Sequence, residues 1–239
     1  MVAVALFDPC YMAAIRPGDA GHARHVLEAL GDSVTLIDGR CCGQPAFNSG
    51  FRAEARAAGR ELLRAAREHG AVIVPSASCT AMATHYLPSL FEGARARTAG
   101  AIGARFSEFA AYVASHPGLE GLGLRLAGTV VYHDSCHARR ELGLTATVLG
   151  LLARVEGLEV RRLPNEAECC GFGGAFSVKQ PEVSVAMMTG KLDEIAASGA
   201  RVVVSTDLSC LAHLESGARG IGLGFETWTV AEVLSRALA

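Results

Sequence analysis

Six short runs that contain β-branched and other apolar residues occur along the chain, and each is followed by a polar or glycine-containing turn. Runs of this length and composition predict buried β-strands. They lie at 2–7, 33–38, 71–75, 128–133, 158–163 and 201–206, with a further candidate at 221–226. Segments rich in Ala, Leu, Glu and Arg, at 50–69, 140–154 and 181–198, predict helices between them. Strands that alternate with helices indicate parallel sheets with right-handed crossovers.

The eight cysteines fall into two sets with the same order: a single cysteine, a Cys-Cys-Gly triplet and a second single cysteine. The gaps between them are 30 and 36 residues in the first set and 32 and 39 in the second. The sets are Cys10, Cys41, Cys42 and Cys79, and then Cys136, Cys169, Cys170 and Cys210. Matched spacing of this kind indicates an internal duplication. We therefore predict an α/β fold of two tandem pseudo-symmetric repeats, 1–125 and 126–239, each a small parallel sheet flanked by helices.

Every cysteine follows the C-terminal end of a predicted strand. Loops beyond these ends converge on one edge of an open α/β sheet, so four thiols in each repeat should meet. Four thiols can hold an iron–sulfur cluster or a zinc ion, or they can be buried, inert cysteines. Two matched sets favour a metal site over inert cysteines. Zinc sites usually use close Cys-x-x-Cys knuckles, so the long gaps favour iron–sulfur, with zinc open at one site.

The amino-acid composition and charge narrow the class of protein but do not identify the residues of the site. Half of the 239 residues are hydrophobic and 19% are charged, which predicts ordered domains. The net charge of −2 and pI near 6.4 indicate no nucleic-acid partner. No apolar run reaches the roughly 18 residues of a membrane span, and MVAVALFDPC is more typical of a buried strand than of a signal peptide. We expect a cytoplasmic protein without membrane insertion, in which disulfides are rare.

Four segments together, CCGQPAFNSG, PSASC, YHDSCHARRELG and CCGFGGAFSVK, resemble the CCG cysteine-rich domain family over nearly the whole chain. The resemblance implies an iron–sulfur protein with one or two [4Fe-4S] clusters on the eight cysteines. It further implies an electron-transfer role beside other subunits of a complex that oxidises L-lactate to pyruvate, with no catalytic residues of its own. Related CCG domains occur in the iron–sulfur subunit of glycolate oxidase, in anaerobic glycerol-3-phosphate dehydrogenase and in one of the subunits of heterodisulfide reductase.

The chain departs from the fuller family motif at the end of each repeat. Where that motif has Cys-x-x-Cys, this chain has Ser76-Ala-Ser-Cys79 and Asp207-Leu-Ser-Cys210. Each repeat thus offers four thiolates rather than five, which favours an ordinary four-cysteine cluster over a heterodisulfide-reductase-type catalytic subunit. A zinc-binding interaction scaffold is the other alternative. Ser76 and Asp207 are candidate oxygen ligands, although both residue types also commonly cap helices and turns.

Two further groups of residues lie close to the second cysteine set. His133, Asp134 and His137 occur in HDSCH, where they are either hydrogen-bond donors to a cluster or packed structural residues. Arg139, Arg140 and Glu141 follow and are typical of the solvated start of a helix. The alternative is that an arginine this close to the site contacts a carboxylate substrate or a partner subunit. The glycine-rich GFGGAF lacks the Gly-x-Gly-x-x-Gly register, so we predict no dinucleotide site there.

Overall fold

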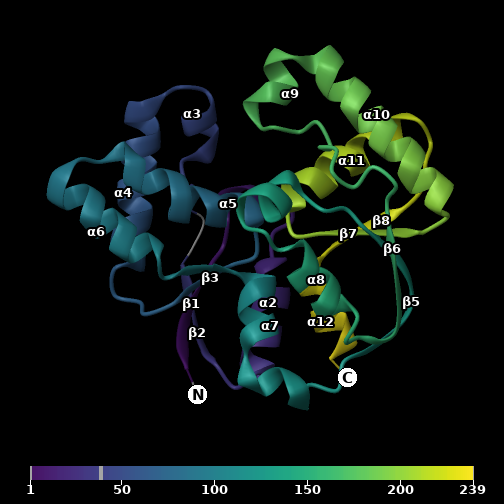
Figure 1. The fold of residues 1–239 in the computed structure, drawn as a ribbon, viewed down its shortest axis with the longest axis horizontal. Helices are drawn as coiled ribbons and strands as arrows, with labels where there is room; N and C mark the ends of the chain where they lie inside the picture. The colour runs from purple at the N-terminus through teal and green to yellow at the C-terminus, as the bar shows by residue number, and fades with distance from the viewer. Residues whose placement is uncertain (1, 38–39, 239) are drawn as a thin grey trace. The chain divides into compact units, whose positions relative to one another are not determined.

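The computed structural model describes residues 2–37 and 40–238. They form two compact units, Met1–Leu119 and Glu120–Ala239, and each unit contains a four-stranded parallel sheet with helices against it (Figure 1). The predicted α/β fold of two tandem repeats is confirmed. The assignment of one cysteine-rich repeat to 1–125 and another to 126–239 stays a prediction.

The sheet of the first unit has the strand order β2-β1-β3-β4, and all its pairs are parallel. Its strands are β1 (Ala3–Phe7), β2 (Ser33–Ile37), β3 (Val72–Val74) and β4 (Phe106–Glu108). Its helices are α1 (Cys10–Ile15), α2 (Ala20–Ala29), α3 (Gln44–Asn48), α4 (Arg52–Ala66), α5 (Ala77–Ala81), α6 (Gly93–Gly103) and α7 (Phe109–Ser115), with a π-helical turn η1 (Met82–Tyr86) and 3₁₀ turns η2 (Leu87–Leu90) and η3 (Pro117–Gly121).

The second unit repeats this plan with the order β6-β5-β7-β8. Its strands are β5 (Arg125–Tyr132), β6 (Glu156–Arg162), β7 (Val202–Ser205) and β8 (Glu226–Thr229). Its helices are α8 (Thr145–Leu152), α9 (Ala175–Lys179), α10 (Pro181–Ser198), α11 (Leu208–Gly220) and α12 (Val230–Ala237), with a π-helical turn η4 (His137–Glu141). The duplication seen in the cysteine spacing is therefore a duplication of topology.

The strand registers match as well as the strand order. In the first unit Leu6 pairs with Ile73, and in the second Tyr132 pairs with Val204. In each unit these partners lie four residues before the first cysteine of the set and six residues before the last one. The cysteines of the two units therefore stand at equivalent positions on equivalent strands.

The strand order explains where the site forms. Within the sheet, β2 lies next to β1 on one side and β3 lies next to β1 on the other, so the chain reverses its direction across the sheet after β2. Right-handed crossovers in opposite directions place their helices on opposite faces. In the first unit α4 and α6 accordingly contact each other, and Tyr112 of α7 donates a hydrogen bond to Asp32, which follows α2, at 2.7 Å. The point where the direction reverses, between β1 and β3, is the usual ligand crevice of such sheets.

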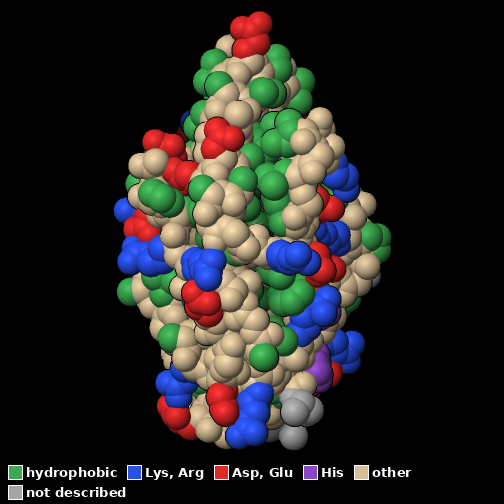
Figure 2. All heavy atoms as spheres, turned by 90° about the vertical axis from the view of Figure 1, so that its right-hand side faces the viewer, with side chains coloured by type: hydrophobic (Ala, Val, Ile, Leu, Met, Phe, Trp, Pro, Cys, Tyr) green, Lys and Arg blue, Asp and Glu red, His purple; other side chains and the backbone are tan. Residues whose placement is uncertain are grey.

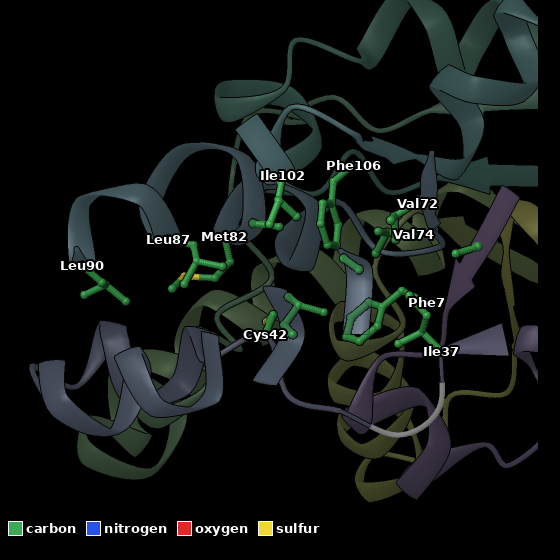
Figure 3. Close-up of a cluster of buried hydrophobic side chains, with 14 of the residues drawn as sticks. Phe7, Ile37, Cys42, Val72, Val74, Met82, Leu87, Leu90, Ile102 and Phe106 are labelled. Carbon is green, nitrogen blue, oxygen red and sulfur yellow. The ribbon is translucent and has the colours of Figure 1, made fainter. Parts of the chain in front are cut away.

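The core of the first unit packs α4, α6, η1 and η2 against the sheet (Figure 3). Its buried side chains include Phe7, Ile37, Cys42, Val72, Val74, Met82, Leu87, Leu90, Ile102 and Phe106. Burying each large apolar side chain contributes about 1.5–3 kcal/mol. Because one of the cysteines belongs to this core, the packing that stabilises the sheet also fixes part of the thiol set.

Three expectations about the elements were wrong or incomplete. β4 is a strand of only three residues, too short for its alternation to stand out in the sequence. The run 221–226 is mostly loop, since Ile221 is exposed and the strand begins only at Glu226. The helix expected at 140–154 is divided into η4 and α8, and Gly143 lies between them at φ 64°, a left-handed conformation that ends the turn.

Among the described residues, no helix combines the length and the apolar character that crossing a bilayer requires. On the face shown in Figure 2, acidic and basic side chains are interspersed.

Candidate metal centres

The first unit brings four thiols together at the carboxyl ends of three neighbouring strands. Cys10 begins α1 after β1, Cys41 and Cys42 lie in the loop after β2, and Cys79 lies in α5 after β3. The Sγ atoms of Cys42 and Cys79 are 3.3 Å apart. The side chains of Cys10 and Cys42 both lie beside that of Cys41 and lower its pKa. The four sulfur atoms therefore form one connected group.

The second unit builds the same arrangement from β5, β6 and β7. Cys136 follows β5, Cys169 and Cys170 follow β6, and Cys210 lies in α11 after β7. Cys169 accepts hydrogen bonds from the thiols of Cys136 and Cys170. A ring nitrogen of His133 and the Sγ atoms of Cys170 and Cys210 all lie within 4.8 Å of one another. The second group thus contains a histidine in addition to four thiols.

The glycine of each Cys-Cys-Gly triplet is required by its conformation and by its surroundings. Gly43 has φ 91° and Gly171 has φ 88°, both in the left-handed region that favours glycine. A Cβ atom at Gly43 would lie 2.9 Å from the carbonyl oxygen of Ala55, and one at Gly171 would lie 2.5 Å from that of Ser184. In each loop the glycine amide donates to Sγ of the first cysteine of the pair at 3.4 Å. The glycine thereby lets the loop lie close to a helix while the glycine's own amide faces the sulfur of the first cysteine.

Gly171→Ala is expected to lower the free energy of unfolding of the second unit by about 2–4 kcal/mol, because it combines a left-handed alanine with a backbone clash. Gly199→Ala is a control in the same unit, since Gly199 is left-handed (φ 66°, ψ 4°) and an added Cβ there would meet only Arg161 Nη1, at an ordinary 3.9 Å. It should cost only the conformational part, about 1–2 kcal/mol. Urea denaturation measures both variants. Equal losses would show that the contact with α10 does not matter.

Each thiol set contains one cysteine that its neighbours hold as a thiolate. The pKa of Cys41 is lowered to about 2, first by the hydrogen bond from Cys10 and then by the one from Cys42. The pKa of Cys169 is likewise lowered to about 2, first by Cys136 and then by Cys170. The thiols that donate have raised pKa values: Cys10, Cys42, Cys136 and Cys170. A metal that takes all four thiolates must therefore displace protons.

His133 is buried, with 1% of its surface exposed. Its pKa is lowered to about 4, mainly because burial penalises the charged ring and further because of the positive charge of Lys191. The imidazole is therefore neutral near pH 7. Its Nε2 atom is buried and has no hydrogen-bond partner among the described residues.

The other polar residues near the cysteines have structural contacts. Ser76 Oγ accepts a hydrogen bond from the Cys79 amide at 3.4 Å, as an N-cap residue does. Asp207 Oδ2 accepts one from Ser135 Oγ at 2.7 Å. His137 Nδ1 lies 3.6 Å from the sulfur of its neighbour Cys136. These contacts give Ser76 and Asp207 structural roles, and an oxygen ligand from either residue stays a prediction.

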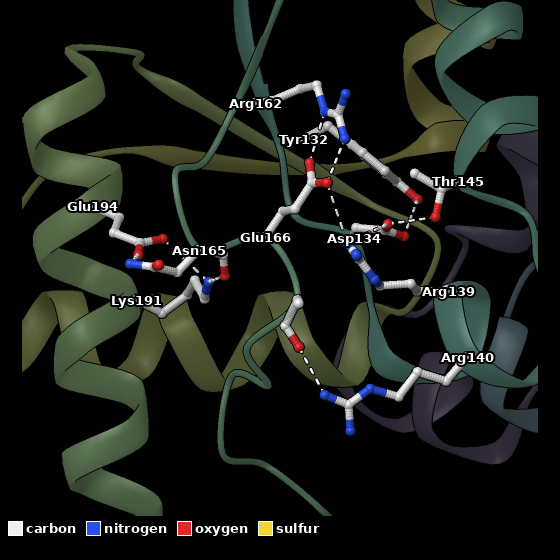
Figure 4. Close-up of polar contacts among 11 residues, drawn as sticks. Tyr132, Asp134, Arg139, Arg140, Thr145, Arg162, Asn165, Glu166, Lys191 and Glu194 are labelled. Carbon is white, nitrogen blue, oxygen red and sulfur yellow. Dashed lines mark hydrogen bonds and ion pairs between the residues drawn. The ribbon is translucent and has the colours of Figure 1, made fainter.

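Arginines of η4 support the loop that leads to the second cysteine pair (Figure 4). Arg139 Nη1 lies 3.2 Å from Glu166 Oε1 and 3.8 Å from Asp134 Oδ2, and Arg140 donates to the carbonyl oxygen of Ala167 at 2.8 Å. Burial raises the pKa of Asp134 although Arg139 opposes the shift. Arg140 is exposed, as expected for the solvated start of a helix, whereas Arg139 is partly buried by its ion pairs with the loop.

Lys191 is a buried residue of the site region that sequence reasoning missed. Its side chain is fully buried on α10, and its Nζ donates to the Asn165 carbonyl oxygen at 2.6 Å and to Glu194 Oε2 at 3.1 Å (Figure 4). The helical period that places Ser184 and Ile195 on the buried face of α10 places Lys191 there too. That period was the available signal.

Comparison with known proteins agrees with this geometry. The model of the CCG family, "Cysteine-rich domain", matches residues 4–83 and 130–215, once in each unit. "Lactate utilization protein A 1" of Bacillus anthracis is 32% identical over 238 residues, covering 98% of both chains. "Lactate utilization protein A" of Macrococcus caseolyticus is 35% identical, covering 97% of this chain and 96% of its own. The solved structure of an aspartate racemase homologue from Pyrococcus horikoshii aligns over 100% of this chain and 97% of its own, at 14% identity and a TM-score of 0.31, too distant for any inference.

Proposed function

The chain belongs to the CCG cysteine-rich domain family, and from that premise we propose that it is an iron–sulfur electron-transfer subunit of a system that uses L-lactate. The relatives supply the metabolic context, because two of them are named for lactate utilization. The observation that carries the chemistry is the pair of equivalent strand-end sites, each with four connected thiols.

The donor set fits a [4Fe-4S] cluster in each unit. Such clusters are commonly held by four cysteine thiolates, and each unit offers four. The ligands would be Cys10, Cys41, Cys42 and Cys79 in one unit and Cys136, Cys169, Cys170 and Cys210 in the other. The Gly43 and Gly171 amides, which already donate to thiol sulfurs, would help to stabilise the negative charge of the group. When bound, a cluster supplies one-electron transfer.

Oxidation of lactate would then belong to other subunits of the system. Lactate loses two electrons on conversion to pyruvate, whereas a cluster takes up one at a time, so a partner with its own cofactor must carry out the substrate step. In this proposal the chain accepts electrons from that partner and passes them on. The chain alone should not oxidise lactate.

A zinc site is the second candidate, favoured by the closeness of the donors. The 3.3 Å separation of the Cys42 and Cys79 sulfurs is compatible with binding to one ion. A four-iron cluster held by the same four thiolates would require a wider separation of their sulfur atoms. A heterodisulfide-reductase-type catalytic subunit has less support, since each unit offers four thiols and Ser76 and Asp207 have other contacts.

Metal analysis after anaerobic purification tests the proposal. We expect about four irons and four acid-labile sulfides for each occupied site, and hence up to about eight of each per chain. Dithionite reduction should bleach the visible absorbance and produce an electron paramagnetic resonance (EPR) signal. Addition of lactate should do so only when the partner subunits are present. Stoichiometric zinc without sulfide would instead establish the zinc alternative.

A further inference from the structure

The second thiol group contains a polar atom that its surroundings leave without a partner. His133 lies at the end of β5, is buried, and places a ring nitrogen within 4.8 Å of the sulfurs of Cys170 and Cys210. Its Nε2 has no hydrogen-bond partner among the described residues. A buried polar atom without a partner costs about 1–3 kcal/mol. The position of the ring therefore indicates that a further acceptor or ligand completes this site.

The ring can donate a hydrogen bond in either protonation state, because an imidazole always carries at least one N–H. Burial and Lys191 favour its neutral form, whereas Cys169, Asp207 and Glu194 favour the charged form. A neutral imidazole has one N–H donor and one acceptor nitrogen. Sulfur atoms of thiolates and sulfides accept hydrogen bonds. A cluster held by the four thiols would give this N–H an acceptor.

The first unit provides an internal comparison. The residue that follows Leu6 on β1 is Phe7, and the residue that follows Tyr132 on β5 is His133. Since Leu6 and Tyr132 occupy equivalent register positions, Phe7 and His133 are equivalent as well. Phe7 is fully buried in the core cluster that contains Cys42 (Figure 3). The two sites therefore differ at this position by a hydrogen-bond donor.

Building on the proposed function, we propose that His133 donates a hydrogen bond from Nε2–H to a sulfur of the second unit's cluster and so raises its reduction potential above that of the first unit's cluster. Reduction adds one electron, and hence one negative charge, to the cluster. A donor stabilises the more negative reduced form more than the oxidised form, and hydrogen bonds to the sulfurs are among the determinants of cluster potentials. The second cluster is then reduced before the first, so a chain that has taken up one electron carries it on the second cluster.

An EPR-monitored redox titration of the full chain tests this inference. In wild type we expect two transitions. His133→Phe, which copies the residue of the first unit, should lower the higher of the two reduction potentials. The expected change in the oxidised-to-reduced ratio at a given ambient potential is about tenfold, which for one electron corresponds to a shift of about 59 mV. His133→Gln retains an N–H donor and should stay close to wild type. Phe7→Leu is the matched control and should leave the higher transition unchanged.

The outcomes distinguish this inference from the proposal on which it rests. Absence of iron and sulfide from the wild-type chain would overturn the proposed function itself. Intact clusters with unchanged potentials in His133→Phe would overturn only the role of His133. Strong ¹⁴N hyperfine coupling in wild type, lost in His133→Phe, would overturn the hydrogen bond and make His133 an iron ligand. If His133→Phe does not retain its iron, His133→Leu, which also lacks a donor, is titrated in its place.

Discussion

Replacing Cys170 with serine is expected to remove the iron and sulfide of the second site, about half of what a fully loaded chain binds. Cys170 is almost completely buried at the centre of its thiol set, between Cys169 and Cys210. A serine hydroxyl does not ionise near neutral pH and is a poor ligand for iron, so the site would have three thiolates. Iron and sulfide analysis of the anaerobically purified variant measures the loss, together with the visible absorbance.

Cys42→Ser is the matched variant, since Cys42 occupies the equivalent position and is also buried. It should remove the iron of the first site and leave that of the second. The double variant should bind almost none. If Cys170→Ser had the iron content and spectrum of wild type, the ligand assignment in the second unit would be wrong. A loss in only one of the single variants would show that one repeat alone binds a cluster.

Glu194→Ala is expected to lower the free energy of unfolding of the second unit by about 3–5 kcal/mol. Glu194 Oε2 is 3.1 Å from the fully buried ammonium group of Lys191. Removing one partner of a buried ion pair leaves a buried charge without compensation, which carries a cost of this size. Urea denaturation, followed by a probe for the second unit, measures the change.

Two control variants separate the buried charge from the loss of any salt bridge. Glu28→Ala removes an exposed pair with Arg24 and should change stability by less than about 1 kcal/mol. Lys191→Leu removes the buried charge itself and should cost less than Glu194→Ala. This variant copies the first unit. Ala55 and Ser184 are equivalent, because each lies against the glycine of its Cys-Cys-Gly triplet. The residue seven positions later is Leu62 in the first unit and Lys191 in the second. A loss as large as that of Glu194→Ala would contradict this account.

The same pair predicts a dependence on pH. Burial opposes ionisation of Glu194, but hydrogen bonds from Asn165 and Lys191 outweigh it and lower its pKa from 4.5. A carboxyl group with a lowered pKa in the folded state stabilises the protein above its unfolded-state pKa, and that stabilisation is lost as the pH falls through the lower folded value. The difference between wild type and Glu194→Ala should therefore be constant near neutral pH and shrink below about pH 4.5. A difference that grew as the pH fell would contradict the assignment.

The parts of the fold that could be predicted were those set by local patterns. The six predicted runs from 2–7 to 201–206 correspond to strands in the structure, because β-branched residues pack well on a pleated sheet. The expected burial holds for β1, β3 and β7, whereas the edge strands β2 and β6 are mostly exposed. β4 and β8 were missed or misplaced since Phe106–Glu108 and Glu226–Thr229 are short and partly polar. Their place in the sheets depends on pairing with β3 and β7, which are distant in sequence.

The sequence by itself determined that two matched sets of four cysteines follow the ends of parallel strands, because spacing along the chain and strand order suffice to bring them to one edge. Only the tertiary structure decided what else lies at that edge. That His133 faces Cys170 and Cys210, that Phe7 takes its place in the first unit, and that Lys191 is buried beside Glu194 follow from strand register and helix packing. These contacts join residues from separate elements, and burial, which governs their protonation and hydrogen bonding, exists only once those elements are packed together.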